Sequence, residues 1–417
     1  MSDYLKRVID YEIAQVFPQL PALCIAGAKG VGKTETAQRL ARTTYQLDQV
    51  DTRTILQADP RIFLQQPPPP VLLDEWQLLP ETWDTVRRAV DAGARPESFL
   101  LTGSASPKPG VQTHSGAGRI ITLRMRPLTL SERGIATPTV SLRGLFAGDE
   151  AVTGSSDLTA SDYADAICQT GLPGFQQLTG RALRLAVDSY LRDVMDKDIF
   201  TQGYFTRTPH TLRAWLRSYA QATATTASYA QILEGATAGE GNKPSSETTR
   251  TYRDFLTKLW ILEPLEAWQP LGSGWKRLTS SPKHHLVDPG FAARLLDLES
   301  QDLLTPAGAN MYGALFESLA VLCVRVFAQA LEATVGHFRT RAGEHEVDLV
   351  LQGRGGAIVA LEVKTANRVT DHDVKHLLWL RERVGEKMRA AAVLYGGKQA
   401  YMRKDGIAVI PLGCLGL

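Results

Sequence analysis

Short apolar runs alternate with amphipathic stretches in the first third of the chain. The runs at 23–27 (LCIAG), 71–75 (VLLDE) and 98–104 (SFLLTGS) have the apolar character of buried strands. Residues 4–17 and 34–43 instead place apolar side chains at helical spacing. Apolar strands that alternate with helices predict a parallel sheet that is covered on both faces.

The remaining pattern is more helical and ends in a second α/β region. Helical patterns follow a polar stretch at 135–160, and residues 205–285 read as short helices followed by a strand. The last hundred residues predict one long apolar helix and then further strands and a helix. These later elements are strands at 336–351, 357–364 and 390–395 and a helix at 371–384.

Composition restricts the function classes only slightly. The 417 residues are 44% apolar and 22% charged, with a net charge of +2, so no global basic field indicates nucleic acid. The four cysteines are widely spaced, which suits a reducing compartment and predicts a cytoplasmic protein. No signal-peptide core and no apolar run of about 20 residues is present, so we expect no membrane span.

A phosphate-binding loop is predicted at GAKGVGKT, residues 27–34. The motif follows an apolar strand and opens a helix, which is the context that it requires. Glycine at 27, 30 and 32 lets backbone N–H groups converge on phosphate oxygens, Lys33 can reach the β and γ phosphates, and Thr34 can ligate Mg²⁺. The predicted ATP-binding residues are Gly27, Gly30, Val31, Gly32, Lys33, Thr34 and Glu35.

Two adjacent acids end the apolar strand at 71–75. We expect Asp74 to lie on the Mg²⁺ side and Glu75 to orient or deprotonate the attacking water. Adjacent acids at the end of a buried strand would be costly without a nearby cation. Thr102 or Ser104, at the end of the next apolar run, could sense the γ-phosphate or simply form a turn.

This series of motifs resembles a known family. GAKGVGKT, ADPRIFLQQPPPPVLLDEWQLLP, FLLTGSAS and GRIITLRMRPLTLSE, followed by TGLPGF and YLRDVMDKDI, are similar to the bacterial and archaeal AAA-type ATPases that carry a DUF4143 region. The resemblance implies an ATPase core, a winged-helix-like segment and a C-terminal domain of the PD-(D/E)xK nuclease type. Arg119 matches the family's GR, and it could contact phosphate in cis, act in trans as an arginine finger, or be an ordinary surface arginine.

The expected fold class is therefore α/β in three parts. A P-loop NTPase parallel sheet comes first, then a helical and winged-helix-like segment, then an α/β PD-(D/E)xK-like domain. The expected boundaries are 1–138 for the ATPase domain, 139–204 for a helical connector or lid, 205–285 for the winged-helix-like segment and 286–417 for the nuclease-like domain.

The segment 205–285 has a local basic excess of ten Lys or Arg over six Asp or Glu. Some of these residues fall on a predicted helix and others in a possible wing hairpin, GSGWKR and its flank. They are Arg250, Arg253, Lys258, Lys276, Arg277 and Lys283. Such residues suit phosphate contacts with DNA, but the same pattern fits a solvated helix face in a domain-packing module.

The C-terminal region predicts a metal-dependent nuclease site. Asp348 lies on one apolar strand, and Glu362 and Lys364 follow on the next strand, fourteen residues later and across a glycine turn. Glu317, in the preceding apolar helix, matches the upstream acid of this fold. Carboxylates at Glu317, Asp348 and Glu362 suit Mg²⁺ or Mn²⁺, with Lys364 near the attacking water. The same set can also persist in a domain that only binds DNA or another chain.

Three functions stay open at this point. The leading hypothesis is an ATPase coupled to DNA binding and metal-dependent cleavage, with Lys33, Glu75, Asp348, Glu362 and Lys364 as catalytic residues. The second is an ATP-driven switch or assembly protein with a catalytically silent C-terminal domain. The third is a toxin-like NTPase. A homo-oligomer is compatible with each of them.

Overall fold

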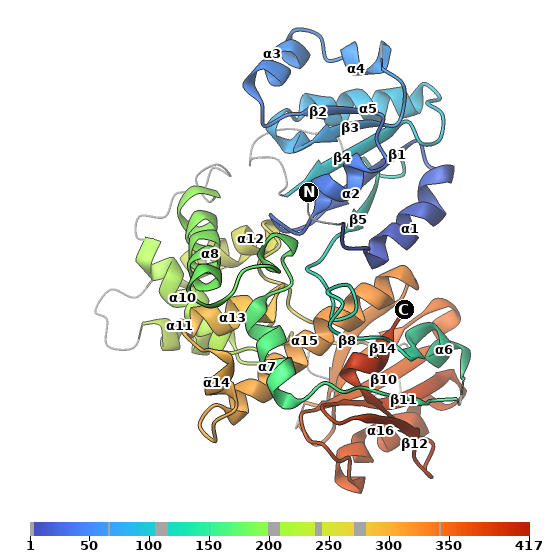
Figure 1. The fold of residues 1–417 in the computed structure, drawn as a ribbon, viewed down its shortest axis with the longest axis vertical. Coiled ribbons are helices and arrows are strands. Elements are labelled where there is room, and N and C mark those ends of the chain that lie inside the picture. Colours follow the sequence, from blue (N-terminus) through green and yellow to red (C-terminus); the bar gives the residue numbers. More distant parts are fainter. Residues whose placement is uncertain are drawn as a thin grey trace.

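The computed structural model describes most of the chain. The described residues are 4–65, 67–104, 116–149, 151–198, 209–237, 244–270, 281–341 and 343–417. Figure 1 shows the N-terminal sheet at the top, a mostly helical part at the lower left and a second sheet at the lower right.

The N-terminal part is a parallel sheet with helices around it. Within the described ranges its strand order is β2-β3-β4-β1-β5, and every pair is parallel. The strands are β1 (Ala22–Ala26), β2 (Thr43–Gln46), β3 (Val71–Asp74), β4 (Phe99–Gly103) and β5 (Ile121–Arg124). The helices are α1 (Val8–Val16), α2 (Lys33–Gln38), α3 (Val50–Ala58), α4 (Ile62–Gln65) and α5 (Glu81–Asp91). The predicted parallel α/β sheet is confirmed.

The order of the strands decides which side chains meet. β4 lies between β1 and β3, with Leu101 opposite both Cys24 and Leu73. The loop after β1 and the acids after β3 therefore lie at the same sheet edge, with the end of β4 between them. All three strands are buried, as their apolar sequences predict.

The middle part is helical. Its helices are α7 (Ala160–Gln169), α8 (Gly180–Asp193), α10 (Pro209–Gln221), α11 (Tyr229–Ala236), α12 (Ser246–Lys258), α13 (Pro289–Leu295) and α14 (Ser300–Leu303). After α12 the chain forms two antiparallel bridges, Leu262 with Leu286 and Leu265 with Lys283. The predicted wing at GSGWKR, including Lys276 and Arg277, lies outside the described residues, so the winged helix stays a prediction.

The C-terminal part is a mixed sheet in the order β7-β12-β13-β11-β10-β9-β8, over the portion of the chain described. Its main strands are β8 (Thr334–Arg339), β9 (Glu346–Gln352), β10 (Ile358–Lys364), β11 (Met388–Tyr395), β12 (Gln399–Met402) and β13 (Ala408–Pro411). β9 and β10 form the predicted antiparallel hairpin, with Leu361 opposite Leu349. α16 (Asp371–Val384) has the predicted bounds.

The first strands of the segment 139–204, expected as a helical connector or lid, pair with strands near the end of the chain. β6 (Val140–Ser141) pairs with β14 (Leu415–Gly416), and β7 (Gly154–Ser155) pairs with β12; α6 (Leu142–Ala147) lies between them in sequence. Within the described residues, β7 thus extends the C-terminal sheet, whereas β6 and β14 form a separate two-stranded sheet. This short polar stretch has no periodicity of its own, so only pairing with distant strands makes it extended.

Helix α15 (Ala309–Ala330) joins the parts. It contacts α1, α7, α13, β8 and β10, and in Figure 1 it lies between the helical part and the C-terminal sheet. By length and a hydropathy of 1.6 it could cross a membrane, yet 67% of that apolar stretch is buried inside the protein. Its apolar sequence is explained by this burial in the core.

Candidate functional site

The loop between β1 and α2 requires glycine on steric grounds. Gly30 and Gly32 have φ values of +76° and +101°, which L side chains rarely adopt. A Cβ atom at Gly27 would lie 2.1 Å from the backbone oxygen of Met125. The three glycines of the motif are therefore needed for this backbone path.

Lys33 begins α2 beneath the loop. Its side chain is 5% exposed, and Nζ donates to the backbone oxygen of Ala28 at 2.9 Å. Burial lowers the pKa of Lys33 to about 8, although Glu75 and Asp74 act in the opposite direction. An anion bound in the loop would replace this lost solvation, which is the role expected of a phosphate-binding lysine.

Asp74 ends β3 and is 4% exposed. Its Oδ1 accepts a hydrogen bond from Thr34 Oγ1 at 2.8 Å and another from Thr102 Oγ1. Burial raises the pKa of Asp74 above its ordinary value. A hydroxyl and a carboxylate oxygen brought together in this way are suitable ligands for Mg²⁺, so the residues present fit the expected ion.

Glu75 is held in a constrained position beside Asp74. Its φ of 57° is unusual for a residue other than glycine, and such strain is concentrated at functional sites. Its Oε2 accepts hydrogen bonds from Ser104 Oγ at 3.1 Å and from Gln77 Nε2, while its N–H donates to Thr102 Oγ1 at 3.2 Å. Thr102 and Ser104 thus contact the two acids. The hydrogen bond from Gln77 to Glu75 was not predicted, because a glutamine in a turn has no distinctive sequence pattern.

Arg7 is a buried residue that sequence reasoning missed. Its Nη1 donates to the backbone oxygen of Val31 in the phosphate-binding loop at 2.7 Å, and its Nη2 donates to that of Arg126 at 2.6 Å. Nε pairs with Glu132 at 3.2 Å, with both side chains almost fully buried. One guanidinium thus joins the loop to the segment that follows β5.

A second buried ionic cluster joins all three parts of the chain. Glu263 Oε1 lies 2.9 Å from Arg124 Nη1, 2.9 Å from Arg126 Nε and 3.3 Å from Arg325 Nη1. Although burial acts to raise it, these three guanidiniums lower the pKa of Glu263 to about 2. Arg126 also contacts Gln329 of α15 at 2.7 Å. We call these residues the Glu263 junction.

Arg119 lies at the surface and does not belong to the Glu263 junction. Its side chain is about half exposed, and Nε pairs with Asp91 at the end of α5 at 2.8 Å. This is the surface ion pair that the sequence left open as an alternative. A role for Arg119 toward nucleotide stays a prediction.

The predicted C-terminal residues come together, but around a lysine. Lys283 Nζ lies 2.8 Å from Asp348 Oδ1, 3.0 Å from Glu317 Oε1 and 3.0 Å from Glu346 Oε1. Lys283 is 2% exposed, so the phosphate contact with DNA that the sequence suggested for it is wrong. The antiparallel bridge with Leu265 that places Lys283 beside the C-terminal sheet has no signature in the local sequence.

The other members of this carboxylate cluster are paired except at Glu362 Oε1, which is buried without a hydrogen-bond partner among the described residues. Lys364 Nζ lies 2.8 Å from Glu362 Oε2, and Asp348 Oδ2 accepts a hydrogen bond from Val363 N at 2.9 Å. Burial and the charge of Asp348 raise the pKa of Glu362 well above its ordinary value. Burial opposes the effect, but Lys283 and Lys364 lower the pKa of Asp348.

This arrangement does not fit the divalent metal that the sequence predicts. Mg²⁺ would need carboxylate oxygens at about 2.1 Å from a common point, and Lys283 Nζ lies among the oxygens of Glu317 and Asp348. Among the residues that the structure describes, no group of three or more His, Cys, Asp or Glu side chains forms a metal-binding arrangement. The geometry as it stands is that of a buried ion-pair cluster.

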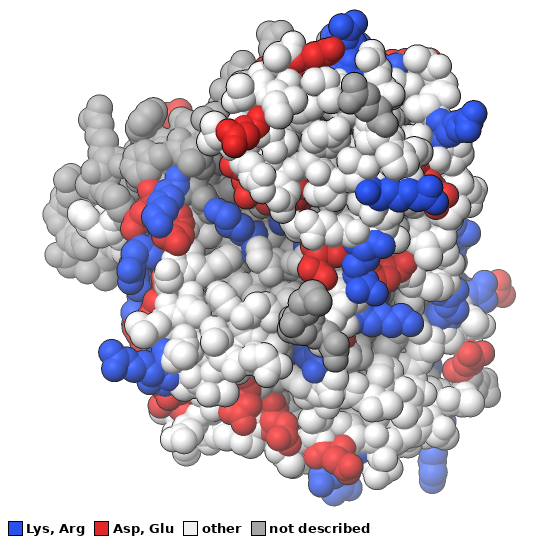
Figure 2. Space-filling model, turned by 45° about the horizontal axis from the view of Figure 1, so that its top comes forward, with Lys and Arg blue, Asp and Glu red and all other residues white. Residues whose placement is uncertain are grey.

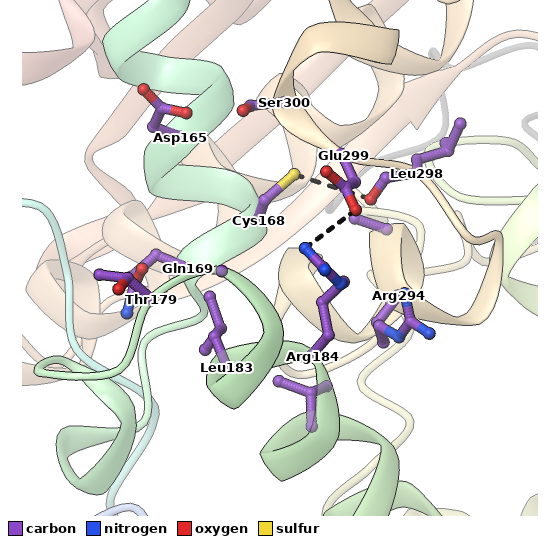
Figure 3. A pocket seen from close by; sticks show the side chains of 13 residues that line it. Asp165, Cys168, Gln169, Thr179, Leu183, Arg184, Arg294, Leu298, Glu299 and Ser300 are labelled. Carbon is purple, nitrogen blue, oxygen red and sulfur yellow. Dashed lines mark hydrogen bonds and ion pairs between the residues drawn. The ribbon is translucent and has the colours of Figure 1, made fainter.

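A further hollow of about 350 Å³ lies between α7, α8 and the segment around α13 and α14 (Figure 3). Burial raises the pKa of the Cys168 thiol there to about 12, so it is a poor nucleophile. Arg184 pairs with Glu299 at 3.1 Å, and Arg294 pairs with Asp188 at 2.7 Å. The cationic groups at its wall are thus already paired.

Charged side chains of both signs are mixed on the surface. On the face shown in Figure 2, Lys and Arg are interspersed with Asp and Glu. This agrees with the small net charge, and the described residues form no extended basic patch on that face.

The fold and the site at Gly27–Thr34 define a P-loop ATPase: a parallel sheet, a glycine loop that opens a helix, and a buried acid beside the loop's threonine. Residues 19–133 match the AAA domain family AAA_14, and residues 312–415 match DUF4143, a domain of unknown function. These two matches support the AAA_14/DUF4143 ATPase family that the sequence predicted. Residues 160–302 match another domain of unknown function, DUF8612.

Individual relatives are distant. The uncharacterized proteins Rv2008c of Mycobacterium tuberculosis and Mb2031c of Mycobacterium bovis are each 24% identical over 404 residues, covering 94% of this chain and 80% of theirs. Among solved structures, the Walker-type ATPase PABY2304 of Pyrococcus abyssi is 14% identical, with a TM-score of 0.41, covering 70% of this chain and 96% of that one. The ORC2 protein of Aeropyrum pernix, solved as ADPNP-ADP complexes, is 14% identical, with a TM-score of 0.30, covering 73% and 92%.

Proposed function

We propose that the chain is an ATP-driven switch, in which turnover at the phosphate-binding loop alters the middle and C-terminal parts. The observation that carries this proposal is the position of Arg7. It contacts the loop through Val31 O at 2.7 Å and the segment after β5 through Glu132 and Arg126. A shift of the loop on binding phosphate would displace this guanidinium from at least one partner.

The ATPase roles follow from the donors and acceptors around the loop. Backbone N–H groups from Gly27 to Glu35 cradle the phosphates, and Lys33 neutralises charge on the β and γ phosphates. Thr34 and Asp74 would hold Mg²⁺, which would offset charge on the phosphate oxygens when bound. Glu75 orients the attacking water, and its contacts with Ser104 and Gln77 fix its carboxylate.

The route from the loop to the C-terminal part runs through the Glu263 junction. Arg126, whose carbonyl accepts from Arg7, pairs with Glu263, and Glu263 pairs with Arg325 of α15. Because these groups are buried, breaking any one of these ion pairs would leave an uncompensated charge in the protein interior, which is costly. We infer that this junction is the element that nucleotide binding biases.

Hydrogen exchange tests the switch. With ADP and with a non-hydrolysable ATP analogue, we expect exchange to differ in 121–126 and 309–330 as well as in 27–38. In Glu263→Gln the distant differences should disappear while nucleotide affinity is kept. Asp297→Asn, which breaks an exposed pair with Arg217, is the matched control. Differences confined to 27–38 in the wild type would contradict the proposal.

DNA binding is a second, finer proposal. Arg250 and Lys258 are exposed on α12, which suits contacts with phosphates. If DNA is the partner, Arg250→Glu should weaken binding of a fluorescent duplex at low salt, and ATP and ADP should give different affinities. Equal binding by the variant and the wild type would remove α12 as the contact surface.

Metal-dependent cleavage is favoured only by the order of Asp348, Glu362 and Lys364 on adjacent strands. Incubation of plasmid with Mg²⁺ or Mn²⁺ tests it directly. Cleavage that is lost in Lys364→Ala would establish the nuclease hypothesis, and intact plasmid beside active ATP turnover supports the silent C-terminal domain.

A homo-oligomer in which Arg119 acts in trans is a separate proposal. It rests on the exposure of Arg119 and on the small stabilisation expected from its surface ion pair with Asp91, which would be easily broken. In this case Arg119→Ala should lower kcat, and specific activity of the wild type should rise with protein concentration. Concentration-independent turnover would exclude an arginine finger from a neighbour.

A further inference from the structure

The carboxylates of the C-terminal cluster converge on an ammonium group supplied by a distant segment. Lys283 Nζ lies within 3.0 Å of oxygens from Glu317, Glu346 and Asp348, and its side chain is almost completely buried. We propose that Lys283 is the resident cation of this cluster, occupying the place of a divalent metal. The C-terminal domain would then be held together by a tethered charge instead of binding a catalytic ion.

The backbone around Lys283 is hydrogen-bonded to its neighbours and to the C-terminal sheet. Lys283 N donates to Leu265 O at 2.9 Å, and Leu265 N donates to Lys283 O at 2.8 Å. His337 of β8 contacts Ser281 O through Nε2 at 2.9 Å, and its own carbonyl accepts from Trp268 N at 2.7 Å. The backbone on both sides of Lys283 is thus attached to the edge of the C-terminal sheet, and Nζ itself is held by its three ion pairs with Glu317, Glu346 and Asp348.

Charge and distance both oppose a divalent ion beside Lys283. A metal shared by Asp348 and Glu317 would have to lie close to the present position of Nζ, where it would meet a like charge. The other charged groups at the cluster are paired, although Glu362 Oε1 is buried without a hydrogen-bond partner among the described residues. Lys364 pairs with Glu362, and Arg339 lies 3.6 Å from the second oxygen of Glu346.

This inference deepens the proposed function, because it gives a physical reason for a C-terminal domain that does not cleave. It rests on that proposal for its biological meaning only. The measurement below uses no nucleotide, so its failure is distinguishable from a failure of the ATP-driven switch.

Manganese binding to the full-length chain without nucleotide provides the test. Free Mn²⁺ is followed by its electron paramagnetic resonance signal, and any uptake at Thr34 and Asp74 is common to all variants. We expect Lys283→Ala to bind one more Mn²⁺ per chain than the wild type, and Lys283→Ala with Asp348→Asn to lose this gain. Lys387→Ala, at an exposed lysine of the same domain, should gain none. A folded Lys283→Ala without the additional ion would overturn the proposal.

If Lys283→Ala does not fold, a comparison of Mn²⁺ binding by the wild type and by Glu362→Gln tests the proposal instead. Glu362→Gln replaces a buried carboxyl group by a neutral isostere of nearly the same shape. If Lys283 is the resident cation, wild type and Glu362→Gln should take up equal amounts of Mn²⁺. A lower uptake by Glu362→Gln would show that the wild-type cluster already binds metal, which contradicts the proposal.

Discussion

The Glu263 junction yields the largest stability effect that we expect from a single polar substitution. Glu263 is fully buried among Arg124, Arg126 and Arg325, and these cations lower its pKa from 4.5 to about 2. At about 1.4 kcal/mol per pKa unit, the difference corresponds to about 3 kcal/mol in favour of the ionised form. Glu263→Gln removes the negative charge of the carboxylate and leaves the three guanidiniums without their anionic partner.

Removal of one partner from a buried ionic cluster commonly costs about 3–5 kcal/mol, because the remaining charges stay desolvated. We therefore expect Glu263→Gln to lower the free energy of unfolding by about 3 kcal/mol or more at pH 7, measured by urea denaturation. Asp297→Asn, which breaks the exposed pair with Arg217, should cost less than about 1 kcal/mol.

The pH dependence of the stability difference between wild type and Glu263→Gln provides an independent check of the sign. A carboxyl group with a lowered folded-state pKa contributes its stability above the unfolded value, here 4.5, and loses it as pH falls toward about 2. The difference between wild type and Glu263→Gln should therefore be constant from pH 7 to about pH 5 and shrink below that. A loss at pH 7 no greater than that of Asp297→Asn would refute the reasoning.

Three further outcomes are expected. Because burial lowers the pKa of Lys33 to about 8, ATP affinity should fall as pH rises above 8, seen by titration calorimetry, and Lys33→Arg should lack this inflection. Glu75→Gln should keep ATP binding and lower kcat by ~10²-fold or more in a phosphate-release assay, whereas Glu382→Gln, on the exposed side of α16, should not change it. Burial raises the pKa of Glu12 to about 7, so its ionisation costs stability as pH rises from 4.5 through 7. Glu12→Gln should accordingly raise Tm at pH 8 but have little effect at pH 4.5, and an equal shift at both values would contradict this reasoning.

Local chemistry made the ATPase site predictable. The glycine loop, Lys33 and Thr34 lie on eight consecutive residues, and Asp74 and Glu75 end an apolar run. A parallel sheet brings the carboxyl ends of its strands to one edge, so these two short stretches had to meet if the fold was right. The same reasoning placed Asp348 near Glu362 and Lys364, because a hairpin fixes its own register.

By itself, the sequence determined the parallel sheet, the phosphate-binding loop, the acids at the end of β3 and the C-terminal hairpin, since each depends on periodicity or on neighbours along the chain. Tertiary structure alone decided that Arg7 contacts the loop, that Glu263 joins three parts of the chain and that Lys283 enters the carboxylate cluster. The contacts of Arg7 with Glu132 and of Lys283 with Asp348 span 125 and 65 residues. An isolated Lys or Arg has the same sequence pattern whether it is solvated or buried, and only the packing of distant segments distinguishes the two.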